Sequence, residues 1–100
     1  MQIAWQGPDA LAVYVTSPGA SPPLGPGVVT GGDAYWVLES SDFPNGFVSP
    51  VDYGQVPAGA ADASEKNGAA AGGAALEKGR CYKVTVTTTD FAVSSITLTW

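Results

Sequence analysis

The chain has 100 residues, a formal net charge of −5 and only four basic side chains. Four cations are too few to neutralise a run of phosphates, so the composition argues against nucleic acid and against an anionic membrane surface as partners. Hydrophobic residues make up 45% of the sequence, which predicts a single domain with its own core over residues 1–100.

The N-terminal segment and the cysteine content predict where the chain works. Residues 1–6, MQIAWQ, show neither the basic nor the apolar region of a signal peptide. The single cysteine, Cys81, cannot form an intramolecular disulfide, which favours a reducing compartment. We therefore expect the chain to fold in a reducing compartment. If it is part of a virion, the hypothesis given at the end of this section, that compartment is the host cytoplasm before assembly, and its final location is the virion. A secreted or cell-surface location stays open if a leader peptide has been removed.

Alternation of apolar and polar residues predicts strands along most of the chain. We expect strands at residues 2–6, 10–16, 34–40, 82–88 and 94–100, with a weaker strand within 47–53. The alternation places the following side chains on inward faces: Leu11, Val13, Val15, Ala34, Trp36, Leu38, Tyr82, Val84, Val86, Ile96, Leu98 and Trp100. Six strands separated by turn sequences predict a small antiparallel all-β fold, either a sandwich or a related barrel.

Two long segments interrupt the strand pattern. Residues 18–27 contain four prolines, and because proline lacks the backbone N–H we expect a surface loop with polyproline character there. Residues 58–75 are almost entirely alanine and glycine around a few polar side chains. Asp62 and Glu65 have the spacing of a capping box, so a short helix ending at Asn67 is one alternative. A long flexible loop with a fraying helical turn is the other, and we favour the loop.

Residues 76–86 have the pattern L-x-x-G-x-x-Y-x-V-x-V, carried by Leu76, Gly79 and Tyr82. This pattern resembles the tyrosine corner of immunoglobulin-like and fibronectin type III-like sandwiches. The resemblance implies that Leu76 fills the core, that Gly79 makes the corner and that the Tyr82 hydroxyl bonds to the upstream backbone. It covers about the last quarter of the chain and implies an Ig-like sandwich, which by itself fixes no function.

The residues that usually carry catalysis are scarce. The chain has no histidine, which removes the commonest general base and metal ligand, and one cysteine cannot build a zinc site. Paired carboxylates leave a small hydrolase as a minor alternative. Asp42 and Asp52, with Asn45 between them, lie in turn sequences but match no calcium loop. We therefore expect no enzyme, no catalytic residue, no metal and no cofactor.

Five aromatic residues are candidates for contact with a partner: Tyr14, Tyr35, Phe43, Phe47 and Tyr53. Tyr14 and Tyr35 fall on the outer faces of their expected strands, and the other three lie in or beside loops. Exposed aromatic side chains bring a large rigid area to an interface at low entropic cost. A second sheet or the long Ala/Gly-rich loop would equally well cover them, so both alternatives stay open.

With nucleic acid, membrane surfaces and catalysis disfavoured by the composition, we expect a structural or interaction protein. The first hypothesis is an accessory or decoration protein of a phage virion or similar large assembly, bound to its own subunits or to a capsid-like lattice. The alternative is an adhesin-like module that binds a carbohydrate or a surface through its loop aromatics.

Overall fold

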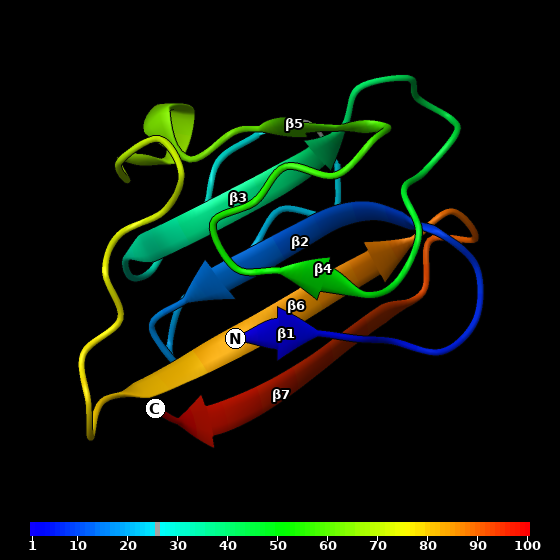
Figure 1. Cartoon of the computed structure of the whole chain (residues 1–100). Coiled ribbons are helices and arrows are strands. Elements are labelled where there is room, and N and C mark those ends of the chain that lie inside the picture. The colour runs from blue at the N-terminus through cyan, green and yellow to red at the C-terminus, as the bar shows by residue number, and fades with distance from the viewer. Residues whose placement is uncertain (26) are drawn as a thin grey trace.

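Residues 1–25 and 27–100 are described in the computed structural model, and they form an all-β fold of two antiparallel sheets (Figure 1). The larger sheet has the order β5-β3-β2-β6-β7 and the smaller one pairs β1 with β4. The strands are β1 (Gln2–Ile3), β2 (Ala10–Thr16), β3 (Ala34–Ser40), β4 (Val51–Asp52), β5 (Ala60–Asp62), β6 (Cys81–Thr88) and β7 (Val93–Thr99). The predicted all-β antiparallel class is confirmed, and the described strands form two open sheets rather than a closed barrel.

The core lies between the two sheets. Strands β1 and β4 lie across β2 and β6 in Figure 1, and they cover the inner face of the larger sheet. Trp36, Leu38 and Tyr82 are fully or almost fully buried there, with the β-branched Val13 and Val15 of β2 beside them. Branched and aromatic side chains suit this pleated surface, which is why alternation identified these strands.

Two bulges change which side chains face the core. The pairing of β2 with β6 shifts register between Ala10 and Ala12, so Leu11 lines the outer face rather than the core. The pairing of β2 with β3 shifts between Val15 and Thr16, opposite Tyr35. Ala34 therefore belongs to the outer cluster and Tyr35 packs against the core, the reverse of the expected alternation. A bulge adds one residue to one strand, and strict alternation does not anticipate it.

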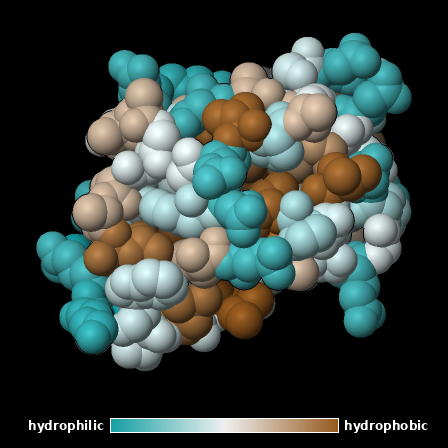
Figure 2. Space-filling view, viewed as in Figure 1, coloured by the Kyte–Doolittle hydropathy of each residue, from teal (hydrophilic) through white to brown (hydrophobic). Residues whose placement is uncertain are grey.

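The last strand is much more exposed than expected. The side chains of Ile96 and Trp100 are 62% and 44% exposed, whereas the alternation placed both inward. Leu98 alone of the three is partly buried against the core. The reason is geometric, because the two short strands of the smaller sheet lie over the middle of the larger one and leave β7 largely uncovered (Figures 1 and 2).

The Ala/Gly-rich segment holds more structure than the sequence suggested. Residues 60–62 form the edge strand β5, and Glu65–Asn67 form the single 3₁₀ turn η1, which Gly68 ends at a φ of 84°. The Ser64 hydroxyl accepts a hydrogen bond of 3.0 Å from the backbone N–H of Val37, and so the segment is fixed to β3. The expected loop is therefore wrong for residues 60–62, which pair with β3 far away in the sequence, whereas the single helical turn expected up to Asn67 is present as η1.

The Pro-rich segment folds back on itself. Ser21 and Thr30 exchange backbone hydrogen bonds of 2.7 and 3.1 Å, and the backbone N–H of Val29 donates to the Asn67 side chain at 2.8 Å. Ala20, within this segment, is buried. The expected extended loop is thus a closed one for its described part; Pro26, the last of its four prolines, lies outside the described residues.

The predicted strands at residues 2–6 and 47–53 are shorter in the structure. They shrink to β1 and β4, which pair through Ile3 and Val51. Phe47 instead makes an isolated antiparallel bridge to Ala10. No helix among the described residues is long and apolar enough to cross a bilayer.

Candidate functional site: an apolar groove on the outer face

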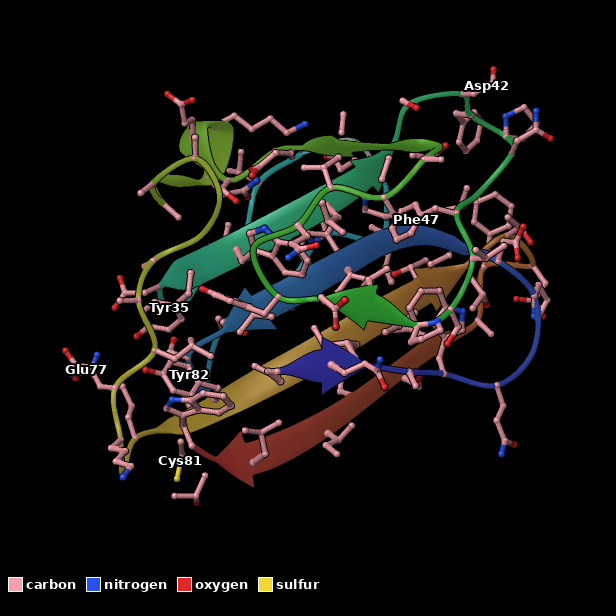
Figure 3. All side chains as sticks on the ribbon, viewed as in Figure 1. Tyr35, Asp42, Phe47, Glu77, Cys81 and Tyr82 are labelled. Carbon is pink, nitrogen blue, oxygen red and sulfur yellow. The ribbon has the colours of Figure 1, made fainter. Side chains whose placement is uncertain are left out.

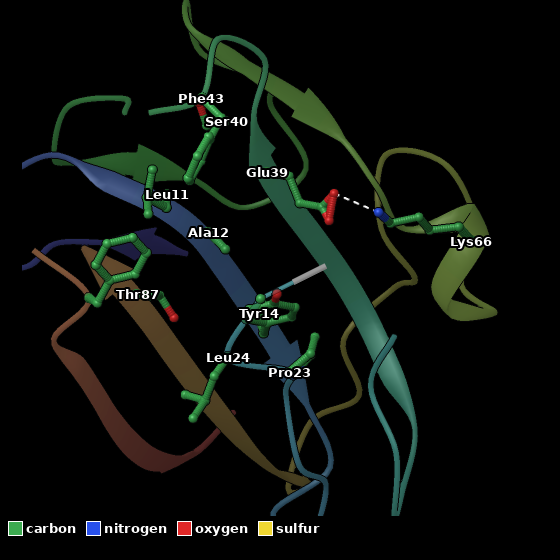
Figure 4. Close-up of a pocket in the computed structure, with 12 residues that line it drawn as sticks. Leu11, Ala12, Tyr14, Pro23, Leu24, Glu39, Ser40, Phe43, Lys66 and Thr87 are labelled. Atoms are coloured by element: carbon green, nitrogen blue, oxygen red, sulfur yellow. Dashed lines mark hydrogen bonds and ion pairs between the residues drawn. The ribbon is translucent and has the colours of Figure 1, made fainter. Parts of the chain in front are cut away.

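The outer face of the larger sheet carries a groove of about 290 Å³. Its lining comes from the strands, from three separate loops and from η1: Leu11, Ala12, Tyr14, Pro23, Leu24, Gly25, Glu39, Ser40, Phe43, Lys66, Thr87 and Phe91. Figure 4 shows Phe43 at one end and Leu24 with Pro23 at the other, with Ala12 and Tyr14 between them. Most of the lining side chains are apolar.

The floor of the groove is made by β2 and its neighbours. Ala12 is the smallest side chain on this stretch of β2, and it leaves the hollow between Tyr14 and Thr87. Tyr14 is only 4% exposed. Burial, with a smaller effect from the Glu39 carboxylate, raises the pKa of Tyr14 to about 12. The phenol is therefore neutral at physiological pH, and the floor carries no charge of its own.

Phe43 stands on one rim because the turn around it is fixed. The backbone N–H of Asn45 donates to the Asp42 carbonyl at 2.8 Å, and the Asn45 amide donates to the Asp42 carboxylate at 3.1 Å. The Ser40 hydroxyl also donates to the carbonyl of Asn45. With its neighbours held in this way, the Phe43 ring is 67% exposed.

Phe91 stands on another rim in an unusual backbone conformation. It lies in the β6–β7 hairpin loop with a φ of 62°, the only positive φ among the described non-glycine residues. Its N–H donates to the Thr88 carbonyl at 2.8 Å, and Thr88 in turn donates its N–H to the Ala92 carbonyl at 3.0 Å. Glycine or asparagine normally takes this position of a hairpin. The fold therefore holds an aromatic ring, 63% exposed, at a position that disfavours one.

The same hairpin holds Asp90 as a carboxylate. The Thr88 hydroxyl and the Ala92 N–H both donate to Asp90, and these hydrogen bonds lower its pKa. The turn is thus fixed by polar contacts made by the neighbours of Phe91, while the Phe91 ring remains free to contact a partner.

The polar end of the groove is neutral overall. The ammonium group of Lys66 lies 2.7 Å from a carboxylate oxygen of Glu39, so the two opposite charges compensate each other (Figure 4). Such a partly exposed pair adds little to stability. Its effect here is that an apolar, uncharged occupant meets no unbalanced charge in the groove.

The five aromatic residues that the sequence singled out are not brought together. Phe43 stands on the groove rim and Tyr14 lies in its floor. Phe47 is 1% exposed and packs edge-on against Trp5 with ring centroids 6.1 Å apart, so it is a core residue rather than an exposed anchor.

Tyr35 and Tyr53 are half-buried, and the Ala/Gly-rich segment contacts both of them. The Tyr53 hydroxyl donates to the Ala74 carbonyl at 2.5 Å, and the Ala74 N–H donates to the Tyr35 carbonyl at 2.8 Å. Tyr35 packs edge-on against Tyr82 with ring centroids 5.1 Å apart, as Figure 3 shows beside Glu77.

Sequence reasoning missed Leu24 and Phe91 as rim residues. Leu24 is 77% exposed at the tip of the Pro-rich loop, which composition alone described only as a loop. A signal for Phe91 existed, since a large aromatic residue follows Thr-Thr-Asp in the short connection between two strands. Turn positions of this kind favour small or polar residues. An aromatic residue there was a reason to suspect a contact role.

The acidic side chains of the described residues do not gather into a metal site. Among residues 1–25 and 27–100, no group of three or more Cys, Asp and Glu side chains converges. Asp42 serves its own turn through Asn45. The groove is therefore the candidate functional site.

Comparisons with protein-family models, with curated proteins and with solved structures find no match for the chain.

Proposed function

We propose that the chain is a non-enzymatic interaction protein that holds an apolar segment of a protein partner in the outer groove. One observation carries the proposal. Leu24, Phe43 and Phe91 come from three different loops, are each more than 60% exposed, and surround one groove. Large exposed apolar side chains gathered around a concavity are typical of protein-binding sites.

The dimensions and the charge of the groove indicate what kind of segment it takes. A cavity of about 150 Å³ accommodates a benzene ring. The groove, at about 290 Å³, therefore has room for about two large side chains. Because Glu39 and Lys66 neutralise each other, we propose an uncharged occupant with two leucine- or phenylalanine-sized side chains.

The conformation of Phe91 supports the same function. A non-glycine residue at positive φ costs about 1–2 kcal/mol. Within this hairpin the ring contributes to the groove rim and lies outside both buried clusters. Strained residues of this kind concentrate at binding sites, where the surrounding structure holds them in place.

The setting that we propose is an accessory or decoration role in a phage virion or similar assembly, with a lattice subunit as partner. The low charge and the apolar contact features support a role in assembly. In this setting the chain should cosediment at fixed stoichiometry with purified virions of its source. Recovery of the whole chain in the supernatant would contradict the virion setting but not the groove.

We also infer a relation to immunoglobulin-like and fibronectin type III-like sandwiches. Three features of the 76–86 segment support it. The Tyr82 hydroxyl accepts a hydrogen bond from the Glu77 N–H, Gly79 has a φ of 81°, and Leu76 packs against the core.

A peptide selection tests the proposed function. The wild-type chain is presented with a library of random uncharged 12-residue peptides and, separately, with a panel of polysaccharides. We expect selected peptides to share two large apolar residues, and we expect Phe43→Ser to weaken their binding by at least about tenfold. Retention on a polysaccharide with no peptide selected would overturn the proposal and support the adhesin-like alternative.

A further inference from the structure

Strand β7 is an unprotected edge of the larger sheet. It forms one end of the order β5-β3-β2-β6-β7, and its register with β6 runs without a shift from Cys81↔Thr99 to Thr87↔Val93. Its sequence, VSSITLT, contains neither a charged residue nor a proline. Edge strands usually carry lysine, proline or a bulge, which prevent pairing with another chain.

Strand β5, at the opposite edge of the sheet, is protected against pairing. Strand β5 has three residues and ends at Asp62, whereas β7 has seven. A short edge with a charged residue is protected against pairing, and a long uncharged one is not. The chain thus has one edge that is suited to accept a further strand.

The hydrogen bonds show which residues of β7 face that open edge. Thr88 donates its N–H to the Ala92 carbonyl, and Trp100 donates its N–H to the Arg80 carbonyl, each at 3.0 Å. These two pairs continue the β6–β7 register by one residue at each end, and hydrogen-bonded pairs alternate with non-bonded ones along an antiparallel ladder. The backbone groups that point outward are therefore those of Val93, Ser95, Thr97 and Thr99.

A two-fold axis at Ile96 is the one position that gives all four outward residues of β7 an outward partner on β7 of a second copy. We infer that β7 pairs antiparallel with β7 of a second copy of this chain, across a two-fold axis at Ile96. In this register Ser95 faces Thr97 of the second copy and Val93 faces Thr99. All four outward residues then lie in hydrogen-bonded pairs, each exchanging two backbone bonds. A two-fold contact of this kind closes after two copies.

The apolar side chains of β7 support the same partner. Ile96 is 62% exposed and Val93 is 46% exposed. Ile96 lies beside a second groove whose lining has no charged side chain, between β1 and β7, and Figure 2 shows hydrophobic atoms along this edge. In the proposed register the two Ile96 side chains meet at a non-hydrogen-bonded pair, where opposing Cα atoms are about 4.5 Å apart. A single strand edge makes a small interface, so we expect a weak, concentration-dependent dimer.

Sedimentation equilibrium over about 5–500 µM tests the inference. We expect the wild-type mass to rise from 10.1 kDa toward twice that value. Ile96→Lys and Ile96→Glu each place like charges across the axis and should weaken dimerisation by at least about tenfold. An equimolar mixture of the two variants should form a heterodimer, since opposite charges then meet. Gln55→Lys, in an exposed turn, is the control and should dimerise as the wild type does.

Three outcomes would overturn the inference. One is a wild-type chain that stays monomeric over the whole range. Another is an Ile96→Lys chain that dimerises as strongly as the wild type. A mixture that fails to associate while both variants show cooperative unfolding would likewise reject the register at Ile96. Peptide binding in the outer groove is measured in a separate experiment, and its result does not depend on whether β7 dimerises.

Discussion

The backbone N–H of Glu77 donates a hydrogen bond of 2.7 Å to the hydroxyl oxygen of Tyr82, and this contact ties the segment before β6 to the core. The Tyr82 ring is 1% exposed and packs edge-on against Tyr35. The aromatic ring therefore belongs to the core while its hydroxyl fixes the chain that leads into β6.

Tyr82→Phe should lower the free energy of unfolding by about 0.5–1.5 kcal/mol, because it removes this hydrogen bond and keeps the ring. The measurement is urea unfolding followed by tryptophan fluorescence. Tyr35→Phe is the matched control, since its hydroxyl makes no hydrogen bond to the described residues, and it should change stability less. Equal effects of the two substitutions would contradict a structural role for the Tyr82 hydroxyl.

Phe91→Gly and Phe91→Ala separate the two roles of this position. Both substitutions remove the ring and should weaken peptide binding. Glycine relieves the strain of a φ of 62°, whereas alanine keeps it. This relief of about 1–2 kcal/mol exceeds the roughly 0.5–1 kcal/mol that glycine costs in backbone entropy. We therefore expect Phe91→Gly to be more stable than Phe91→Ala by about 0.5–1 kcal/mol in urea unfolding. The reverse order would mean that this hairpin does not hold positive φ at residue 91.

Gly46→Ala should destabilise the chain by about 2 kcal/mol or more. A Cβ at residue 46 would lie 2.4 Å from the carbonyl oxygen of Ala10, where the bridge to Phe47 leaves no room to move. Gly19→Ala is the control, because a Cβ there meets no atom within 4 Å. A thermal melt in which both variants unfold at the wild-type temperature would contradict the close approach of the two segments.

Strands whose pattern is local in the sequence could be predicted, and features that depend on contacts between distant residues could not. Alternation located β2, β3, β6 and β7 because successive side chains of a strand point to opposite faces, which leaves a period of two in the local sequence. It missed β5, whose residues Ala60–Asp62 lack branched or aromatic side chains and form a strand only because β3 offers a free edge. The rotation of Tyr35 onto the core depends on a bulge opposite Val15, which local pattern does not encode.

The candidate site was harder to predict for the same reason. Phe43 was expected as a contact residue, but the groove also needs Leu24 and Phe91, which lie 19 and 48 residues away from it in the sequence (43 − 24 and 91 − 43). Their approach is set by the closed Pro-rich loop and by the β6–β7 hairpin. Each of these elements is local, but the pairing of β2 with β3 and with β6 brings them to one face of the sheet, so no window of sequence contains the groove.

The stability of the Ala/Gly-rich segment should depend on pH through Asp62. Burial acts to raise the pKa of this carboxyl, but hydrogen bonds from Ser64 and from the Gly72 N–H outweigh it, and the pKa is lowered. The N–H groups of Ser64 and Gly72 lie 2.8 and 2.7 Å from its two oxygens. A folded pKa below the unfolded value of about 3.9 means that the carboxylate stabilises the fold above that pH.

This stabilisation is lost as the pH falls through the lowered folded pKa. Asp62→Asn should therefore be less stable than the wild type at pH 7, by less than about 1 kcal/mol because solvent screens this largely exposed carboxylate, and the difference should shrink below about pH 4. Urea unfolding at pH 7 and at pH 2.5 measures it. The exposed Asp52→Asn is the control; a pH-independent difference for Asp62→Asn would contradict the role of its charge.

The affinity of the best selected uncharged peptide for rim variants tests the central claim most directly. Leu24→Ser, Phe43→Ser and Phe91→Gly should each raise its dissociation constant by at least about tenfold. Val48→Ser, on a side chain that is 62% exposed and outside the groove lining, should leave it within about twofold. Equal affinities for the three rim variants and for the Val48 control would contradict the assignment of the outer groove as the binding site.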